Sequence, residues 1–318
     1  MSTTPTTPTT ARSSPADSSL LGDLAVLLRP KIAGFVLVSA FVGAALGLGP
    51  DTGQGSVAIL QCLEIALWVT LTAGASSVFN QVLEREVDGD MVRTRLRPLP
   101  SGRLSPRAAL SFGTLLCLAG VLGLALRMNL LSAALALGTT AVYVVVYTPM
   151  KRLSSINTLI GALPGAMPPV LGYCASAGQM GPWAWILFAV IFIWQVPHFM
   201  AIAWLYRGDY AAAGMRMLPA MEGTEGLAGR QAALHALALL PISVLPYIQG
   251  LAGGAYAVCS MTMAAIYLAA SLRFARGEDE RGARMLLLVS LIYLPAYLVL
   301  LLFDPGCAPL TFLATQLP

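Results

Sequence analysis

Long apolar runs alternate with short polar segments along most of this chain. Nine of these runs hold about 20 residues, which is the length that an α-helix needs to cross the hydrocarbon core of a bilayer. The breaks between them contain Gly, Pro and polar residues, as in GLGPDTGQG and SAGQMGPW. The pattern predicts membrane-spanning helices at 31–49, 57–79, 108–127, 129–148, 158–176, 183–204, 231–250, 254–272 and 285–303.

The composition also indicates a membrane protein. Hydrophobic residues make up 57% of the chain and charged residues 11%, whereas soluble domains contain roughly 45–50% and 25%. We therefore expect an all-α, polytopic membrane domain over 23–305. The Thr/Ser/Pro-rich residues 1–22 are expected to form a disordered N-terminal tail, and 306–318 a short C-terminal tail. The five cysteines stand singly, which is typical of small buried side chains.

Basic residues are distributed unevenly between the two sets of predicted loops. Of the 19 Lys and Arg residues, only Arg127 falls on one side of the predicted bundle. Because loops rich in Lys and Arg stay in the cytoplasm, this predicts an N-terminus inside and a C-terminus outside, with the charged loops on the cytoplasmic side. We expect a bacterial cytoplasmic (inner) membrane as the location. Nucleic-acid binding is not expected, because the basic residues are interleaved with membrane spans.

The stretch NQVLEREVDGDMVRTRLRP, residues 80–98, concentrates four acids and four arginines in an otherwise apolar chain. Asn80, Glu84 and Asp88 are spaced by four, so a helix that continues through them places all three on one face. Their carboxylate and amide oxygens suit Mg²⁺, which completes its shell with water and phosphate oxygens. Arginine binds phosphate in a bidentate manner, and four arginines follow the acids: Arg93, Arg95, Arg97 and Arg103. The alternative is that the acids only pair with nearby arginines at a solvated membrane boundary.

A second polar cluster follows the sixth predicted span on the same side of the membrane. There, WLYRGDY places Asp209 beside Tyr206, Arg207 and Tyr210. Two such clusters on either side of a cavity could hold a diphosphate through Mg²⁺ while a hydrocarbon tail lies among the helices. A prenyl diphosphate combines these two chemical features.

Several motifs resemble those of a known family. NQVLEREVDGDMVRTRLRPLPSG is similar to the first signature of the UbiA superfamily of intramembrane prenyltransferases, in the form found in its haem O synthase branch. Three further stretches agree with that branch, and the resemblance covers roughly 25–305. They are YTPMKRLSSINTLIGALPGAMPPVLGY, WQVPHFMAIAW and YRGDYAAAGMRMLP.

Two departures from the superfamily pattern are visible. Most members carry paired aspartates in the second cluster, whereas Tyr206 and Asp209 offer one here, which matches the Tyr-x-x-Asp-Tyr type of the haem branch but puts a second full Mg²⁺ site in doubt. Val196 and Pro197 replace the usual Pro-Pro before His198-Phe199.

The resemblance implies a nine-helix UbiA-like bundle and a specific reaction. In the implied reaction the farnesyl group of farnesyl diphosphate would be transferred to the 2-vinyl group of haem b with addition of water, giving haem O and diphosphate. Haem b is then a substrate and Mg²⁺ the cofactor, and the enzyme would serve haem A and O biosynthesis for terminal oxidases. The implied partners are the lipid bilayer and, as candidates, haem A synthase or oxidase assembly factors.

The predicted site follows from the motifs and the charge pattern together. We expect catalytic roles for Asn80, Glu84, Asp88 and Asp209, with the first three as Mg²⁺ ligands. The predicted substrate-binding residues are Arg93, Arg97, Lys151, Arg152, His198, Tyr206, Arg207 and Tyr210.

Two polar residues in or near spans, His198 and Asn157, have more than one interpretation, whereas His235 has one. His198 could be an axial haem ligand, a partner of a haem propionate or a hydrogen-bonded core histidine. His235 has no comparable context and is expected to be structural. Asn157 opens the fifth span and could cap it or contact substrate.

Two other functions are considered. A UbiA-type enzyme that prenylates an aromatic quinone precursor would share the diphosphate machinery but is expected to carry paired aspartates in its second cluster. A secondary transporter would hold its key polar groups near the bilayer midplane. In this sequence Glu64 is the only clearly intramembrane acid, and the polar groups gather at one face.

Overall fold

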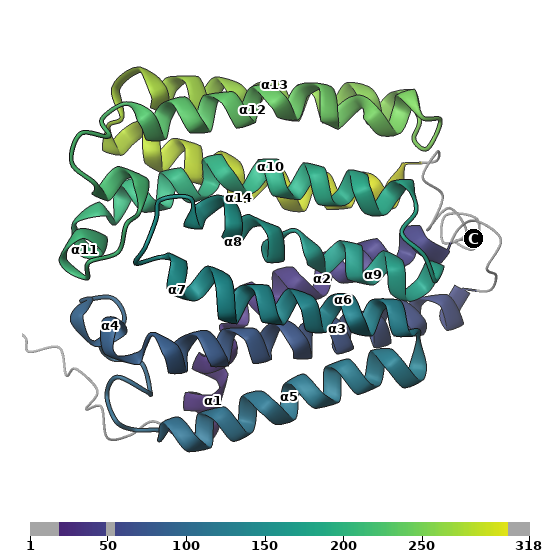
Figure 1. The fold of residues 1–318 in the computed structure, drawn as a ribbon. Helices are drawn as coiled ribbons and strands as arrows, with labels where there is room; N and C mark the ends of the chain where they lie inside the picture. The colour runs from purple at the N-terminus through teal and green to yellow at the C-terminus, as the bar shows by residue number, and fades with distance from the viewer. Residues whose placement is uncertain (1–18, 49–54, 305–318) are drawn as a thin grey trace, which may run out of the picture.

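The structure is a computed structural model that describes residues 19–48 and 55–304. All regular structure in these residues is helical, and the helices run side by side in one bundle (Figure 1). Within the described part of the chain, nine segments are long and apolar enough to cross a membrane, which confirms the predicted number of spans. They are Pro30–Leu48, Ser56–Leu83, Pro106–Arg127, Leu130–Met150, Asn157–Ala177, Pro182–Leu205, Leu227–Ile248, Gly254–Gly277 and Glu280–Phe303.

The individual helices subdivide these spans. The fourth span joins α6 (Leu130–Ala141), a π-helical turn η2 (Val142–Tyr147) and α7 (Thr148–Met150), and the fifth joins α8 (Asn157–Gly165) and α9 (Met167–Ala177). The remaining long helices are α2 (Pro30–Leu48), α3 (Gly55–Leu83), α5 (Pro106–Arg127), α10 (Pro182–Leu205), α12 (Leu227–Ile248), α13 (Gly254–Gly277) and α14 (Glu280–Phe303). The short elements are α1 (Leu20–Leu28), α4 (Arg85–Asp90), α11 (Arg207–Ala212) and η3 (Leu218–Ala220).

Helix α1 precedes the first span and was not expected. Ser19 caps it by accepting a hydrogen bond from the Gly22 amide, and the helix ends at Arg29, whose φ of 51° turns the chain into Pro30. The first three residues of α1 belong to the segment that we assign to the N-terminal tail. Residues 1–18 and 305–318, which hold most of both predicted tails, lie outside the described residues.

Glycines allow α2 and α9 to pack at very short range. A Cβ added to Gly43 would overlap the carbonyl oxygen of Pro169, and one added to Gly172 would overlap that of Ala40. Small residues bring helix backbones together in membranes, where packing rather than the hydrophobic effect drives helix association. Helix α10 lies beside α12, α14, α8 and α9, and thus forms the centre of the bundle.

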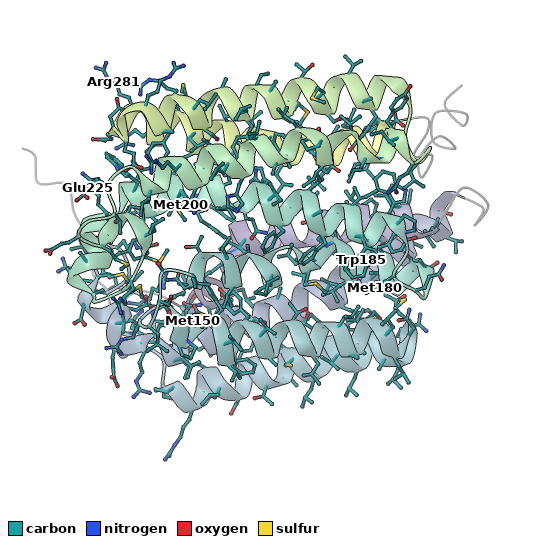
Figure 2. The ribbon with its side chains drawn as sticks, turned by 45° about the horizontal axis from the view of Figure 1, so that its top comes forward. Met150, Met180, Trp185, Met200, Glu225 and Arg281 are labelled. Carbon is teal, nitrogen blue, oxygen red and sulfur yellow. The ribbon has the colours of Figure 1, made fainter. Side chains whose placement is uncertain are left out.

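Polar loops gather at one end of the bundle. Figure 1 shows α4, α7 and α11 together at that end. In Figure 2, Met150, Glu225 and Arg281 lie at the same end, whereas Met180 and Trp185 lie at the other. The loops at 80–107, 149–157, 205–230 and 273–284, which the sequence assigns to one membrane face, therefore lie at the same end of the bundle.

Candidate active site

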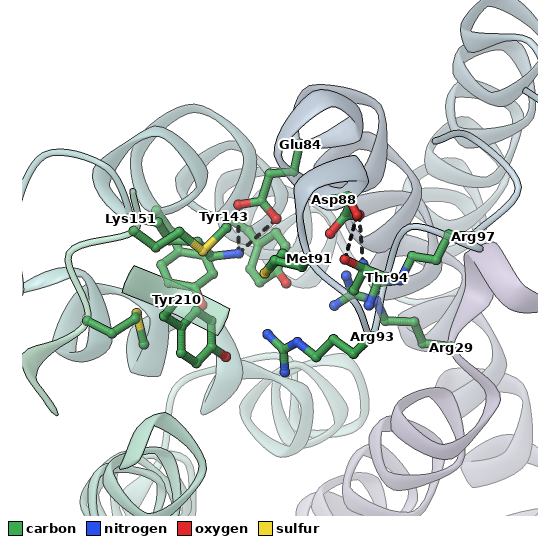
Figure 3. Close-up of a pocket in the computed structure, with 13 residues that line it drawn as sticks. Arg29, Glu84, Asp88, Met91, Arg93, Thr94, Arg97, Tyr143, Lys151 and Tyr210 are labelled. Carbon is green, nitrogen blue, oxygen red and sulfur yellow. Dashed lines mark hydrogen bonds and ion pairs between the residues drawn. The ribbon is translucent and has the colours of Figure 1, made fainter. Parts of the chain in front are cut away.

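A polar pocket of about 200 Å³ opens at this end of the bundle (Figure 3). Four segments that are remote in sequence, at 29, 84–97, 143–151 and 210–217, contribute its walls. The lining residues are Arg29, Glu84, Asp88, Met91, Arg93, Thr94, Arg97, Tyr143, Tyr147, Lys151, Tyr210, Met215 and Met217.

Glu84 and Asp88 enter the pocket from the junction of α3 and α4. The helix is interrupted at Glu84, but the Glu84 amide still donates to the Asn80 carbonyl (2.9 Å) and the Asp88 amide to the Glu84 carbonyl (2.7 Å). The predicted four-residue spacing therefore survives the break, and both carboxylates point into one cavity. Both are buried, with 8% of Glu84 and 2% of Asp88 exposed.

Each of these carboxylates is paired with a cation. Lys151 Nζ lies 2.9 Å from Glu84 Oε1, and Arg97 Nη1 lies 2.7 Å from Asp88 Oδ2. Thr94 Oγ1 donates to the Asp88 carbonyl oxygen (2.7 Å) and so holds the loop after α4 against the helix. Pairing with a neighbouring arginine, the alternative raised by the sequence, is realised for Asp88, whereas Glu84 reaches a lysine 67 residues away.

The π-helical turn η2 supplies the tyrosines of the pocket. Tyr143 and Tyr147 both line it, and Lys151 Nζ lies 4.7 Å from the centre of the Tyr147 ring. A π-turn inserts an extra residue into the helical repeat and is frequent at functional sites. Here it precedes the bend that brings Lys151 to Glu84.

The pocket has an excess of positive charge. Four cations, Arg29, Arg93, Arg97 and Lys151, face only two carboxylates. Burial and the charge of Arg29 lower the pKa of Arg97, and the nearby Asp88 only partly offsets them. Mutual repulsion between these neighbouring cations is relieved when an anion binds, so the electrostatics favour a polyanionic ligand.

Lys151 is held in its charged form. Burial by itself would lower the pKa of Lys151, but the neighbouring acidic groups of Tyr147 and Glu84 raise it more, and the net direction is upward. The lysine therefore stays protonated throughout the neutral pH range and acts as a fixed positive charge.

Arg29 is a site residue that the sequence analysis counted only for topology. Its Nη2 donates to Asn80 Oδ1 (3.2 Å), and its Nε is buried without a hydrogen-bond partner among the described residues. Asn80 is fully buried behind the lining, where its Nδ2 also donates to Thr148 Oγ1 (3.1 Å). The sequence signal that could have marked Arg29 as a site residue is its position directly before the proline that opens the first span.

The second predicted cluster is divided by the structure. Tyr210 lines the pocket, and the Arg93 guanidinium lies between the rings of Tyr206 (4.9 Å) and Tyr210 (4.7 Å), which joins the two clusters. Tyr206 and Arg207 line a separate hollow between the end of α10 and the start of α14. Arg207 there lies 3.9 Å from the Trp204 ring and donates to the Trp204 carbonyl.

The remaining predicted site residues lie outside the lining of the polar pocket. Asp209 is partly exposed on α11, and Arg152 is exposed beside Lys151. His198 lies within α10, where its Nδ1 is 2.7 Å from Ser290 Oγ of α14. Among the other arginines after α4, Arg95 is exposed and Arg103 forms an ion pair with Asp23 of α1 (3.1 Å).

His235, which is expected to be structural, and Asn157, whose interpretation was open, both contact backbone carbonyl oxygens. His235 Nδ1 lies 2.8 Å from the Gln231 carbonyl oxygen in its own helix. Asn157 Nδ2 donates to the carbonyl oxygens of Ser154 (2.7 Å) and Arg216 (3.0 Å), so it ties the loop after Lys151 to the loop after α11.

The donor set of the pocket fits Mg²⁺. Glu84 and Asp88 offer oxygen ligands, and Mg²⁺ is commonly held by one or two carboxylates together with substrate phosphates and water. No group of three or more His, Cys, Asp or Glu residues that could hold a metal by itself occurs in 19–48 and 55–304. A metal at this site would thus depend on the substrate for part of its coordination shell.

Comparisons with known proteins agree with this arrangement. Residues 35–294 match the model of the UbiA prenyltransferase family. The chain is 40% identical over 289 residues to a protein of Solibacter usitatus named protoheme IX farnesyltransferase, and 38% identical over 297 residues to one of the same name from Koribacter versatilis. The alignments cover 89% and 91% of this chain, and 99% and 95% of those proteins.

Solved structures share the fold. One comes from a study of digeranylgeranylglyceryl phosphate synthase in membranes. It aligns with a TM-score of 0.71 at 19% identity, and the alignment covers 91% of this chain and 98% of that one. A UbiA homolog from Archaeoglobus fulgidus bound to DMAPP and Mg²⁺ aligns with a TM-score of 0.64 at 20% identity, covering 91% and 99%. These likenesses establish the architecture of the bundle.

Proposed function

The chain belongs to the UbiA prenyltransferase family, and from this premise we propose that it transfers the farnesyl group of farnesyl diphosphate to the 2-vinyl group of haem b. Water adds in the same reaction, so haem b, farnesyl diphosphate and water give haem O and diphosphate. The relatives named protoheme IX farnesyltransferase, aligned over about nine tenths of this chain, support this activity over prenylation of a quinone precursor or transport.

The observation that carries the proposal is the cationic pocket at the polar end of a membrane bundle. Its four cations and two carboxylates suit a diphosphate, and the apolar helices behind it suit a farnesyl chain. The diphosphate would lie among Arg29, Arg93, Arg97 and Lys151. Tyr210 would bound it on the side of α11.

The chemical step breaks the bond between C1 of the farnesyl group and the diphosphate oxygen, and the electron pair leaves with the diphosphate. Fixed cations placed where this negative charge develops lower the barrier. The allylic carbon then bonds to the vinyl group, water captures the resulting cation, and a proton is released. The surrounding helices exclude other water from the allylic cation.

Glu84 and Asp88 would hold Mg²⁺, which when bound supplies positive charge to the diphosphate oxygens. We propose that Asn80 supports them from behind, because its amide positions Arg29. Lys151 and Arg97 compete for the same two carboxylates, so they are expected to turn toward phosphate oxygens when the substrate and metal enter. Four residues outside the lining remain proposed site residues: Asp209, Arg152, Tyr206 and Arg207.

The protein is a multi-pass membrane protein, and its bacterial relatives suggest the inner membrane. We propose that the polar end, with the pocket, faces the cytoplasm. This orientation gives a soluble diphosphate direct access to the site. Haem A synthase or oxidase assembly factors would receive the product, since haem O is poorly soluble in water.

The test is an activity assay with membranes that contain the protein. Haem b, farnesyl diphosphate and Mg²⁺ should yield a more hydrophobic haem with a mass gain of farnesyl plus water, detected by chromatography and mass spectrometry. Prenylation of 4-hydroxybenzoate with no change in haem b would contradict the proposal.

A further inference from the structure

The contacts of His198 determine which of its ring nitrogens carries the proton. Ser290 Oγ lies 2.6 Å from the Leu287 carbonyl oxygen and 2.7 Å from His198 Nδ1. A hydroxyl has one hydrogen, and at 2.6 Å that hydrogen must lie between Oγ and the carbonyl oxygen, because two acceptors would otherwise repel. Ser290 Oγ can then only accept from His198, so Nδ1 is the protonated nitrogen.

The second ring nitrogen is consequently a lone-pair donor. Among the described residues, the His198 ring makes hydrogen-bond and aromatic contacts with Ser290, Trp194 and Phe199, none of which is an acid, and a buried imidazolium without a counter-ion is costly. A neutral ring protonated at Nδ1 carries its free lone pair on Nε2. No described residue hydrogen-bonds to Nε2, and His198 keeps part of its surface accessible.

Ser290 also holds the ring that packs on His198. Its carbonyl oxygen accepts from Trp194 Nε1 (3.1 Å), and the Trp194 ring stacks on the imidazole at 5.1 Å and 20°. From α13, the hydroxyl of Tyr267 donates to the Trp194 carbonyl (2.9 Å). Three helices therefore fix the imidazole plane, and a single residue of α14 sets both its tautomer and its stacking partner.

The depth of His198 in the bundle suits an apolar acceptor. It lies seven residues before the end of α10, about 10 Å inside the polar end of that helix. An acceptor bound at this depth has its macrocycle among apolar helices, while the diphosphate of the second substrate stays in the polar pocket.

We infer that His198 binds the iron of the haem substrate through Nε2 and that Ser290 is a positioning residue that presents this nitrogen. The inference rests on the proposed function, since it takes haem b as the acceptor. A hydrogen bond on the distal nitrogen of a ligating histidine fixes its orientation and tunes its basicity. Axial ligation would orient the macrocycle and thereby select which vinyl group meets the allylic carbon.

The experiment uses the purified full-length protein with haem b alone, so that binding is measured apart from farnesyl transfer. The wild-type protein is expected to show the iron–histidine stretching band of ferrous haem in resonance Raman spectra. His198→Ala should lose this band, and imidazole added to His198→Gly should restore axial ligation. Ser290→Ala should shift the band and weaken haem binding about 10–100-fold.

Two further variants separate positioning from folding. Ser290→Thr keeps a hydroxyl and should retain the wild-type band. Ser271→Ala removes another fully buried serine hydroxyl, one that donates to the Tyr267 carbonyl of its own helix (2.9 Å), and should leave haem binding unchanged. Farnesyl diphosphate should bind all variants with wild-type affinity if they are folded.

The inference is overturned if His198→Ala keeps the iron–histidine band, or if Ser290→Ala keeps the wild-type band and affinity. Farnesyl transfer to haem b, measured on the wild-type protein, reports separately on the proposed function. A wild-type protein that makes haem O but shows no histidine band would contradict axial ligation and leave the transferase activity in place.

Discussion

Arg29 is the residue whose environment most directly indicates an anion. It ends α1 in a left-handed conformation, and its side chain reaches the pocket, where Asn80 binds one nitrogen and Nε is left buried without a partner among the described residues. A buried donor without a partner costs free energy, which a phosphate oxygen would recover on binding. The bound diphosphate would therefore complete the hydrogen bonds of Arg29.

Replacing Arg29 tests this role. Arg29→Gln is expected to raise the KM for farnesyl diphosphate about 10–100-fold, because a hydrogen bond to a charged group contributes about 1.5–3 kcal/mol. The control is Lys31→Gln, which removes the same charge from an exposed position two residues away. Equal effects of the two variants in steady-state kinetics would show that Arg29 acts only through the net charge of this face.

Replacing Asp88 tests whether its carboxylate binds the metal in competition with Arg97. Asp88→Asn keeps the size of the side chain and an acceptor for Arg97 but removes the negative charge, so turnover should fall about 10²–10³-fold. Asp90→Asn is the matched control, because Asp90 lies on the same short helix and is exposed. Normal turnover in Asp88→Asn, measured at saturating Mg²⁺, would remove this carboxylate from the mechanism.

At the scale of helices, the pocket depends on close packing between α8 and the π-turn. A Cβ added to Gly161 of α8 would overlap the Tyr147 ring, whereas one added to Gly138 of α6 would meet nothing within 4 Å. Tyr147 lines the pocket and lies against Lys151. A glycine outside the pocket thus sets the position of two residues inside it.

Gly161→Ala is therefore expected to affect substrate binding without touching the substrate. Overpacking of this kind costs about 1–3 kcal/mol, and displacement of Tyr147 should raise the KM for farnesyl diphosphate. Gly138→Ala should leave both thermal stability and KM unchanged. If Gly161→Ala also leaves both quantities unchanged, the packing of α8 does not control the pocket.

At the scale of the whole molecule, the charge asymmetry predicts orientation in the membrane. The loops around the pocket lie at one end of the bundle, and α5 ends with Arg127 at the other end. There Arg127 pairs with Glu64 (2.7 Å). The pair also explains the single clearly intramembrane acid of the sequence. Glu64 holds α3 to α5 and has no part in the pocket.

Single cysteines in a cysteine-free background can test this orientation. Glu225 and Gln179 are both exposed, in loops at opposite ends of the bundle. Because the polar end is predicted to be cytoplasmic, an impermeant thiol reagent should label Gln179→Cys on intact bacterial cells. It should label Glu225→Cys only after permeabilisation, and the reverse pattern would invert the proposed topology.

The spans and the location of the chemistry follow from the sequence alone. Segments of about 20 apolar residues must cross a bilayer as helices, because no water is available there to satisfy backbone groups, so a local pattern suffices to predict each span. The four-residue spacing of Glu84 and Asp88 is also local, and it is preserved although the helix breaks between α3 and α4.

Only the tertiary structure decides which polar groups meet. Lys151 pairs with Glu84 across 67 residues, Arg29 with Asn80 across 51, and Ser290 with His198 across 92. A membrane span constrains a residue's depth but not its neighbours, since helices of similar hydropathy can pack in many orders. Close approaches at glycines such as Gly161 select one packing order. That order brings charges from distant parts of the chain into one pocket, and it places Ser290 beside His198, which defines the tautomer of the histidine.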